Sequence, residues 1–158
     1  MVSERVSWGV RSTSPLQFIA AFAAAAAAQR LLPLPLPQGP ALDTLHLAGT
    51  LLANGGLALA LWCVSLFVLQ RTTIMPAHTP AQLIVRGPYR RSRNPFYLAL
   101  LLSYAGLALI LDVPWALATM PLPLLVLART IVPFEEAQLE ARFGRAYDDY
   151  RAVVPRWF

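Results

Sequence analysis

Two short segments of the chain carry residue types that could do chemistry. The first is RGPYRRSRNPFY, Arg86 to Tyr97, which places four arginines around a Gly-Pro turn just before an apolar stretch that begins at Pro95. Proline favours the first turn of a helix, where backbone N–H groups are unpaired and carry partial positive charge. With arginines beside it, such a helix start can bind a carboxylate or a phosphate. Anionic lipid headgroups would satisfy the same loop, so both kinds of ligand remain open.

The second segment is the acidic pair Glu135 and Glu136, which follows Pro133 at the end of a long apolar stretch. Carboxylates beside apolar surface are costly unless paired, and here they could bind the ammonium or sulfonium group of a cationic ligand. They are equally suited to the first turn of a helix, where acidic side chains complement the helix dipole. The pair alone therefore does not establish a site.

The elements that must position these residues are apolar helices. The chain has 158 residues, of which 57% are hydrophobic and 13% charged, and its mean hydropathy is +0.53. In a typical soluble domain, about a quarter of the residues are charged. The composition predicts an all-α integral membrane protein and excludes two soluble domains. The 13 basic residues are all arginines and most flank apolar stretches, which indicates membrane topology rather than nucleic-acid binding.

Apolar stretches predict about four transmembrane helices, over residues 12–32, 44–70, 95–111 and 113–132. The first is Ala-rich and follows Arg5 and Arg11, so a cleaved signal peptide is its alternative. The last two form a hairpin around Asp112, and each arm, at about 16 residues, is slightly short for a bilayer. Pro121 and Pro123 are expected to bend the second arm.

The distribution of arginine predicts the orientation. The loop over residues 71–94 holds five arginines and no acidic residue, so the positive-inside rule places it in the cytoplasm. Four spans then leave both termini on that side. After Pro133 the spacing of Leu139, Phe143, Tyr147 and Tyr150 predicts an amphipathic helix on the membrane surface.

The hairpin returns to the side from which it started, so the arginine loop and the acidic pair can face one pocket. A ligand that carries a carboxylate and cationic groups would match that pocket. S-adenosylmethionine has a carboxylate, an amine and a sulfonium, although the residues alone do not single it out.

The order of three features resembles one family. GPYRRSRNPFY, an apolar hairpin and EEAQLEARFGRAYDDYRAVVPR together are similar to the isoprenylcysteine carboxyl methyltransferase and phospholipid methyltransferase superfamily. The resemblance implies one membrane domain, 1–158, that acts as an S-adenosylmethionine-dependent methyltransferase. Its part over residues 71–156 would hold the cofactor at the cytoplasmic leaflet, and a lipophilic acceptor would arrive from the membrane.

The resemblance also assigns residues. Glu136 is expected to hold the cofactor's amine or position the acceptor, Arg93 to bind the carboxylate, and Tyr89 or Tyr97 to pack on the adenosine portion. Many family members have histidine where this chain has Asn94, so no imidazole can serve as a base at this position. The assigned cofactor-binding residues are Gly87, Tyr89, Arg93, Asn94, Pro95, Tyr97, Glu135 and Glu136, and the assigned catalytic residues are Glu136, Arg93 and Asn94.

The remaining polar residues are expected to be structural. Tyr147, Tyr150 and Arg151 match family positions, but an aromatic stripe at helical spacing favours packing. His46 and His78 lack further ligands at metal spacing, so we expect no metal. Cys63 is expected to be a small buried side chain.

Two other functions remain open. One is a non-catalytic membrane module whose basic loop binds anionic lipid or a partner protein, and the other is a membrane reductase that binds NADPH, as related sterol reductases do. The acceptor, whether a prenylated thiol, a lipid amine or a small hydrophobic acid, and the oligomeric state are not specified by the sequence. The all-Arg, Ala-rich composition suggests a bacterial inner membrane.

Overall fold

The protein is a bundle of helices. The computed structural model describes residues 13–70 and 82–158, and every regular element in these two ranges is helical. Arg5 and Arg11 before the first predicted span, Arg71 of the arginine loop, and His78 lie outside the described residues. The elements of the N-terminal half are α2 (Thr13–Leu31) and α3 (Pro40–Leu69), and those of the C-terminal half are η1 (Gly87–Arg90), α4 (Pro95–Ile110), α5 (Pro114–Thr119), α6 (Pro121–Val126), η2 (Leu127–Ile131), α7 (Val132–Phe143) and α8 (Arg145–Val153).

Proline sets the start of several helices. Pro40, Pro95, Pro114 and Pro121 are the first residues of α3, α4, α5 and α6. A proline at this position has the φ angle that a helix needs, and its missing N–H group would have no intrahelical partner there. The four helix starts are therefore encoded locally.

The surface of the bundle is strongly apolar. The helix Pro40–Leu69 and the continuous helix Pro114–Phe143 are each 30 residues, long and apolar enough to cross a membrane, while Leu16–Leu31 and Pro95–Ile110 are shorter apolar helices. Large side chains point outward, for example Leu61 at 60% and Leu122 at 65% exposure. Apolar surface of this kind is stable in lipid rather than water, which supports a location in the membrane.

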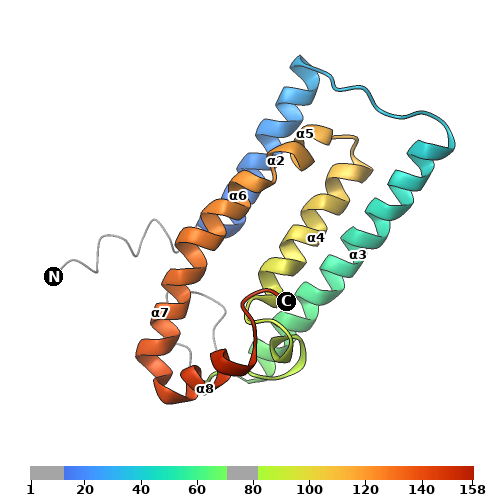
Figure 1. The fold of residues 1–158 in the computed structure, drawn as a ribbon. Helices are drawn as coiled ribbons and strands as arrows, with labels where there is room; N and C mark the ends of the chain where they lie inside the picture. Colours follow the sequence, from blue (N-terminus) through green and yellow to red (C-terminus); the bar gives the residue numbers. More distant parts are fainter. Residues whose placement is uncertain (1–12, 71–81) are drawn as a thin grey trace.

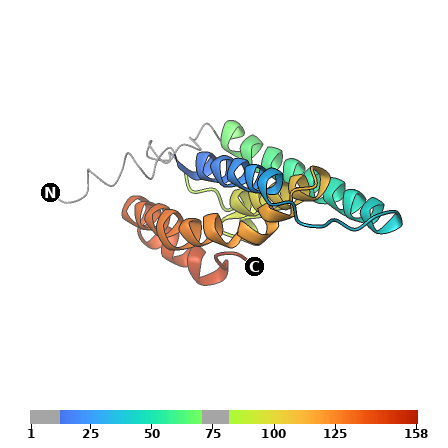
Figure 2. The ribbon, with the colours of Figure 1, turned by 90° about the horizontal axis from the view of Figure 1, so that it is seen from above.

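Helix α4 is the centre of the bundle. In both views it lies between α3 and the long helix formed by α5 to α7 (Figures 1 and 2). The backbones of α3 and α4 lie very close together where they cross. A Cβ atom at Gly49, Gly56 or Gly106 would therefore clash with the opposite helix. A Cβ atom at Gly55, by contrast, would have no atom of the described residues within 4 Å. Small residues at Gly49 and Gly56 thus serve close helix packing.

Helix α2 packs against α4 through aromatic side chains. The rings of Phe18 and Phe22 meet the ring of Tyr104 edge to face, with centroids 5.9 and 5.2 Å apart. Tyr104 and Phe18 belong to the main apolar core, which continues into the long helix through Leu127 and Ile131. The predicted first span, 12–32, therefore corresponds to a helix that packs on the rest of the bundle.

The turn between α4 and α5 lies where the sequence predicted it. Asp112 has a left-handed backbone conformation, with φ of 56°, which acidic residues tolerate better than most. Its carboxylate contacts Nε2 of His46 at 2.9 Å, which ties this turn to the start of α3. At the same end Trp115 donates from Nε1 to the carbonyl of Leu32.

The second arm of the hairpin is longer than predicted. Residues 113–132 were expected to form a short arm followed by a separate surface helix, but the helix runs without interruption to Phe143. Pro133 cannot donate to the carbonyl of Arg129. The chain accommodates this with the π-helical turn η2, in which the N–H of Val132 donates to the carbonyl of Leu127.

The amphipathic segment is two helices rather than one. Helix α7 ends at Gly144, whose φ of 50° is easily adopted by glycine, and α8 then turns back toward the start of α4. The last five residues, 154–158, follow α8 and end beside α4 (Figure 1). We refer to these residues as the C-terminal strap.

Candidate functional site

The loop before α4 is fixed against the end of α3. Gly87 begins η1 with φ of 57°, and a Cβ atom there would lie 3.1 Å from Cδ1 of Leu66 and 3.2 Å from Nε1 of Trp62. Tyr89 is buried beside Cys63, and its ring meets that of Phe67 edge to face. These contacts anchor the loop, so the residues that follow enter α4 in a defined direction.

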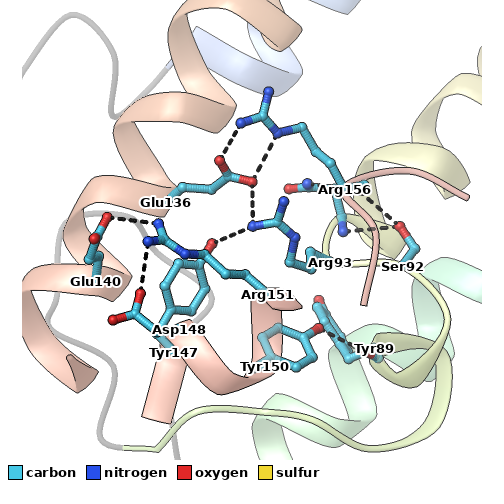
Figure 3. A network of polar contacts seen from close by, with 11 residues as sticks. Tyr89, Ser92, Arg93, Glu136, Glu140, Tyr147, Asp148, Tyr150, Arg151 and Arg156 are labelled. Carbon is cyan, nitrogen blue, oxygen red and sulfur yellow. Dashed lines mark hydrogen bonds and ion pairs between the residues drawn. The ribbon is translucent and has the colours of Figure 1, made fainter. Parts of the chain in front are cut away.

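A network of charged side chains joins this loop to α7 and the strap, with Glu136 at its centre (Figure 3). Oε1 of Glu136 lies 3.1 Å from Nη1 of Arg93 and 3.0 Å from Nε of Arg156. Oε2 of Glu136 lies 2.5 Å from Nη2 of Arg156. One carboxylate therefore holds two guanidinium groups, one of them through two parallel bonds, which is a strong and directional arrangement.

Arg93 is the more deeply placed of the two arginines. Its side chain is 13% exposed, and its Nη1 also donates to the hydroxyl of Tyr147 at 3.1 Å. Burial raises the pKa of Tyr147 above its ordinary value, so the hydroxyl stays neutral and acts as an acceptor. Nε of Arg93 is buried and has no hydrogen-bond partner among the residues that the structure describes.

The strap is held by its backbone as well as by the side chain of Arg156. The carbonyl of Arg156 accepts hydrogen bonds from Oγ of Ser92 at 3.2 Å and Nδ2 of Asn94 at 3.0 Å. The N–H of Arg93 donates to the carbonyl of Pro155 at 3.0 Å. Asn94 is buried. We refer to the hydrogen bonds from Ser92 and Asn94 to the carbonyl of Arg156 as the backbone latch of the strap.

Glu135 has a different environment from its neighbour. It lies beyond the predicted span 113–132, and its Oε1 accepts a 2.7 Å hydrogen bond from the hydroxyl of Tyr97. Burial raises the pKa of Glu135, and the hydrogen bond from Tyr97 opposes the shift. No cation pairs with Glu135 in the described part of the chain. The two adjacent carboxylates thus face different partners on α4 and its preceding loop.

Helix α8 is docked onto the site by polar contacts. The hydroxyl of Tyr150 donates to the carbonyl of Tyr89 at 2.6 Å, and Arg151 bridges Glu140 and Asp148 (Figure 3). These contacts agree with the structural roles expected for Tyr150 and Arg151. Tyr147 is buried too, but it also touches Arg93 directly.

The structure brings most of the predicted site residues together. Arg93, Asn94 and Glu136 belong to one network, and Tyr97 and Glu135 form a neighbouring pair. The other assigned residues are placed around them: Gly87 and Tyr89 in the anchored loop, and Pro95 at the first position of α4. The rings of Tyr89 and Tyr97 are both buried in apolar clusters, and their expected contact with adenosine stays a prediction.

Three participants were not predicted, namely Ser92, Tyr147 in its contact with Arg93, and Arg156. The signal for Arg156 was in the sequence, because it is the last residue of the pattern that ends VVPR. No cluster of three or more His, Cys, Asp or Glu side chains suited to a metal occurs within residues 13–70 and 82–158.

The arrangement suits a ligand with both signs of charge. Glu136 can attract an ammonium group, while the unpaired Nε of Arg93 can donate to an anionic oxygen. Arg93 comes from the loop before α4 and Glu136 from α7, and their side chains meet at the start of α4. The site therefore has the donor set for an amino acid moiety, which S-adenosylmethionine carries.

Comparison with known proteins gives one finding. A family model for phospholipid methyltransferase matches residues 44–146, from α3 into α8. Neither the comparison with curated proteins nor the comparison with solved structures gave a match.

Proposed function

The chain belongs to the phospholipid methyltransferase family, and on that premise we propose that it transfers a methyl group from S-adenosylmethionine to a hydrophobic acceptor held in the membrane. The observation that carries the proposal is the contact between Arg93 and Glu136, 3.1 Å apart. It joins the arginine loop and the acidic pair, which are separated by the whole hairpin in sequence.

The residues of the site would bind and orient the cofactor. S-adenosylmethionine supplies an electrophilic methyl group on a sulfonium centre. Glu136 would hold its ammonium group and Arg93 its carboxylate, because each then faces the opposite charge. Fixing both ends of the amino acid moiety restricts the orientation of the rest of the molecule, and orientation can supply a large part of a rate enhancement.

The site relies on orientation rather than on a base at position 94. The amide of Asn94 cannot take up a proton at neutral pH, and its Nδ2 is engaged with the strap. An acceptor that is already ionised, such as an isoprenylcysteine carboxylate or a thiolate, needs no proton removed. A lipid amine would have to lose its proton to another group.

The proposed arrangement in the membrane has four spans, with both termini and the site on the cytoplasmic side of a bacterial inner membrane. Its support is the position of the arginines. Arg86, Arg90 and Arg91 are exposed beside the site, whereas Asp112 lies at the opposite end of α4. Membrane lipids would surround the helices, and a lipophilic acceptor would reach the site from within the bilayer.

The test is binding of S-adenosylhomocysteine to the protein purified in detergent or nanodiscs, measured by calorimetric titration. We expect saturable binding that is lost in Glu136→Ala. The matched control is Glu140→Ala, one turn further along α7, because Glu140 is half exposed and, within residues 13–70 and 82–158, pairs with Arg151 alone. That variant should bind as the wild type does.

Two results would contradict the proposal. If S-adenosylhomocysteine does not bind to the folded wild-type protein, the cofactor assignment is wrong. If NADPH binds instead, the reductase is favoured.

A further inference from the structure

Both carboxylate oxygens of Glu136 are already engaged by guanidinium groups. Oε1 accepts from both arginines, and Oε2 accepts from Nη2 of Arg156. Its side chain is only 16% exposed, so water cannot easily approach from another direction. A cationic group of a ligand therefore competes with the two guanidinium groups for this carboxylate.

The two guanidinium groups are not equally free to leave. The side chain of Arg93 is 13% exposed and has Tyr147 as a second partner. The side chain of Arg156 is 41% exposed, and Glu136 is the partner of its guanidinium. Solvent can hydrate the guanidinium of Arg156 after it leaves, whereas Arg93 would stay buried without its counter-charge.

Arg156 can leave without undoing the strap. Its backbone carbonyl is held by Ser92 and Asn94, and the preceding carbonyl of Pro155 is held by the N–H of Arg93. Trp157, the next residue along the strap, packs against the main apolar core. Rotation of the Arg156 side chain about its own bonds is then enough to take its guanidinium away from Glu136.

Arg156 is also not needed to bind the anionic end of a ligand. Nε of Arg93 is buried and unpaired, and it lies in the same network. A buried donor without an acceptor is costly, and a ligand carboxylate would remove that cost.

Building on the proposed function, we propose that Arg156 determines specificity at this site: its guanidinium occupies Glu136 until an ammonium group on the ligand displaces it. Ligands with an amino acid moiety can make this exchange. Ligands that lack one leave Arg156 in place and gain nothing from Glu136. The contact thus selects for the charged end of the ligand and keeps Glu136 paired when the site holds none.

The experiment compares two ligands and three arginine variants by calorimetric titration. S-adenosylhomocysteine carries the amino acid moiety, and 5′-methylthioadenosine is its counterpart without that moiety. In Arg156→Gln the competing charge is gone but the backbone latch remains, so we expect the dissociation constant for S-adenosylhomocysteine to fall about two- to five-fold, the size expected for a partly exposed ion pair. Binding of 5′-methylthioadenosine should not change.

The other two variants are matched controls. Arg156→Lys keeps the competing charge and should bind S-adenosylhomocysteine much as the wild type does. Arg93→Gln should weaken its binding, which is the opposite sign from Arg156→Gln although both arginines contact Glu136.

The outcomes separate this inference from the proposed function. Weaker or unchanged binding of S-adenosylhomocysteine to Arg156→Gln, with 5′-methylthioadenosine binding intact, would overturn the role of Arg156 and leave the methyltransferase assignment standing. Failure of the wild type to bind either ligand would instead overturn the assignment itself.

Discussion

The two ends of α4 are held by different kinds of interaction. At its start, a mostly buried network links the preceding loop, α7, α8 and the strap through Glu136. At its end, one half-exposed contact between His46 and Asp112 joins the turn to α3, with side chains 38% and 39% exposed. The difference indicates that glycine and aromatic packing keep the helices together along their length, whereas the start of α4 depends on the same charges that form the candidate site. Stability and ligand binding should therefore be coupled at one end only.

The largest effect should come from removing the centre of the network. Glu136→Ala leaves Arg93 buried without a counter-charge, and loss of one partner of a buried ion pair costs about 3–5 kcal/mol. Because Arg156 can be hydrated, we expect a value near the lower end of this range. Unfolding in detergent, followed by circular dichroism, would measure it. A loss no greater than that of His46→Ala would remove the distinction between the two ends.

A smaller effect should follow from opening the latch on the strap. Asn94→Leu has a similar volume but cannot donate to the carbonyl of Arg156, and a lost hydrogen bond of this kind costs about 1–2 kcal/mol. Cleavage of the last residues by carboxypeptidase should become faster, since the strap is held less tightly. Ser92→Ala is the control, because it removes the longer of the two bonds to the same carbonyl.

At the other end, the contact between His46 and Asp112 should itself matter little. His46→Ala should cost at most about 1 kcal/mol, as partly exposed pairs do. Asp112→Ala should cost about 1 kcal/mol more than that, because alanine is strained at the left-handed φ of this position. Asp112→Asn tolerates this φ and should match His46→Ala. Equal unfolding midpoints for Asp112→Ala and Asp112→Asn would show that backbone strain plays no part.

The smallest change is expected at Glu135, and it should depend on pH. Burial raises the folded pKa above its unfolded value, so the folded state holds the proton more tightly. Wild-type stability should then fall as the pH rises from the unfolded pKa through the folded one. Glu135→Gln keeps an acceptor for Tyr97 and cannot ionise, so its unfolding midpoint should fall less as the pH rises above the unfolded pKa of a glutamate. A steeper fall in the variant would contradict this account.

The positions of the helices were predictable because their signals are local. The prolines that begin α4 and α5, and the acidic residue between the two arms of the hairpin, mark boundaries that the structure confirms. Helix α3 begins at Pro40, four residues before the predicted span 44–70. The continuation past Pro133 was not predictable in the same way. A proline there is compatible with a new helix or with a π-helical turn, and the structure has the second, with Leu127 and Ile131 buried in the main apolar core.

The site was predictable in part for a related reason. Arg93 and Glu136 stand in recognisable motifs, and the hairpin had to bring them to one side of the membrane. Arg156 depends on the reversal at Gly144, and the latch by Ser92 and Asn94 depends on the path of the strap after α8. Those contacts arise from turns whose direction the sequence pattern does not specify.

The π-helical turn at Leu127–Ile131 also fixes the rotational phase of everything after it. One residue adds about 100° of rotation in an α-helix. If the same residues closed as ordinary α-helix, this rotation would be added to the chain, and α7 would then present a different face to α4. Glu136 would turn away from Arg93 while the apolar packing of α5 and α6 stayed as it is. The wider turn of η2 thus absorbs one residue and keeps the second motif in register with the first.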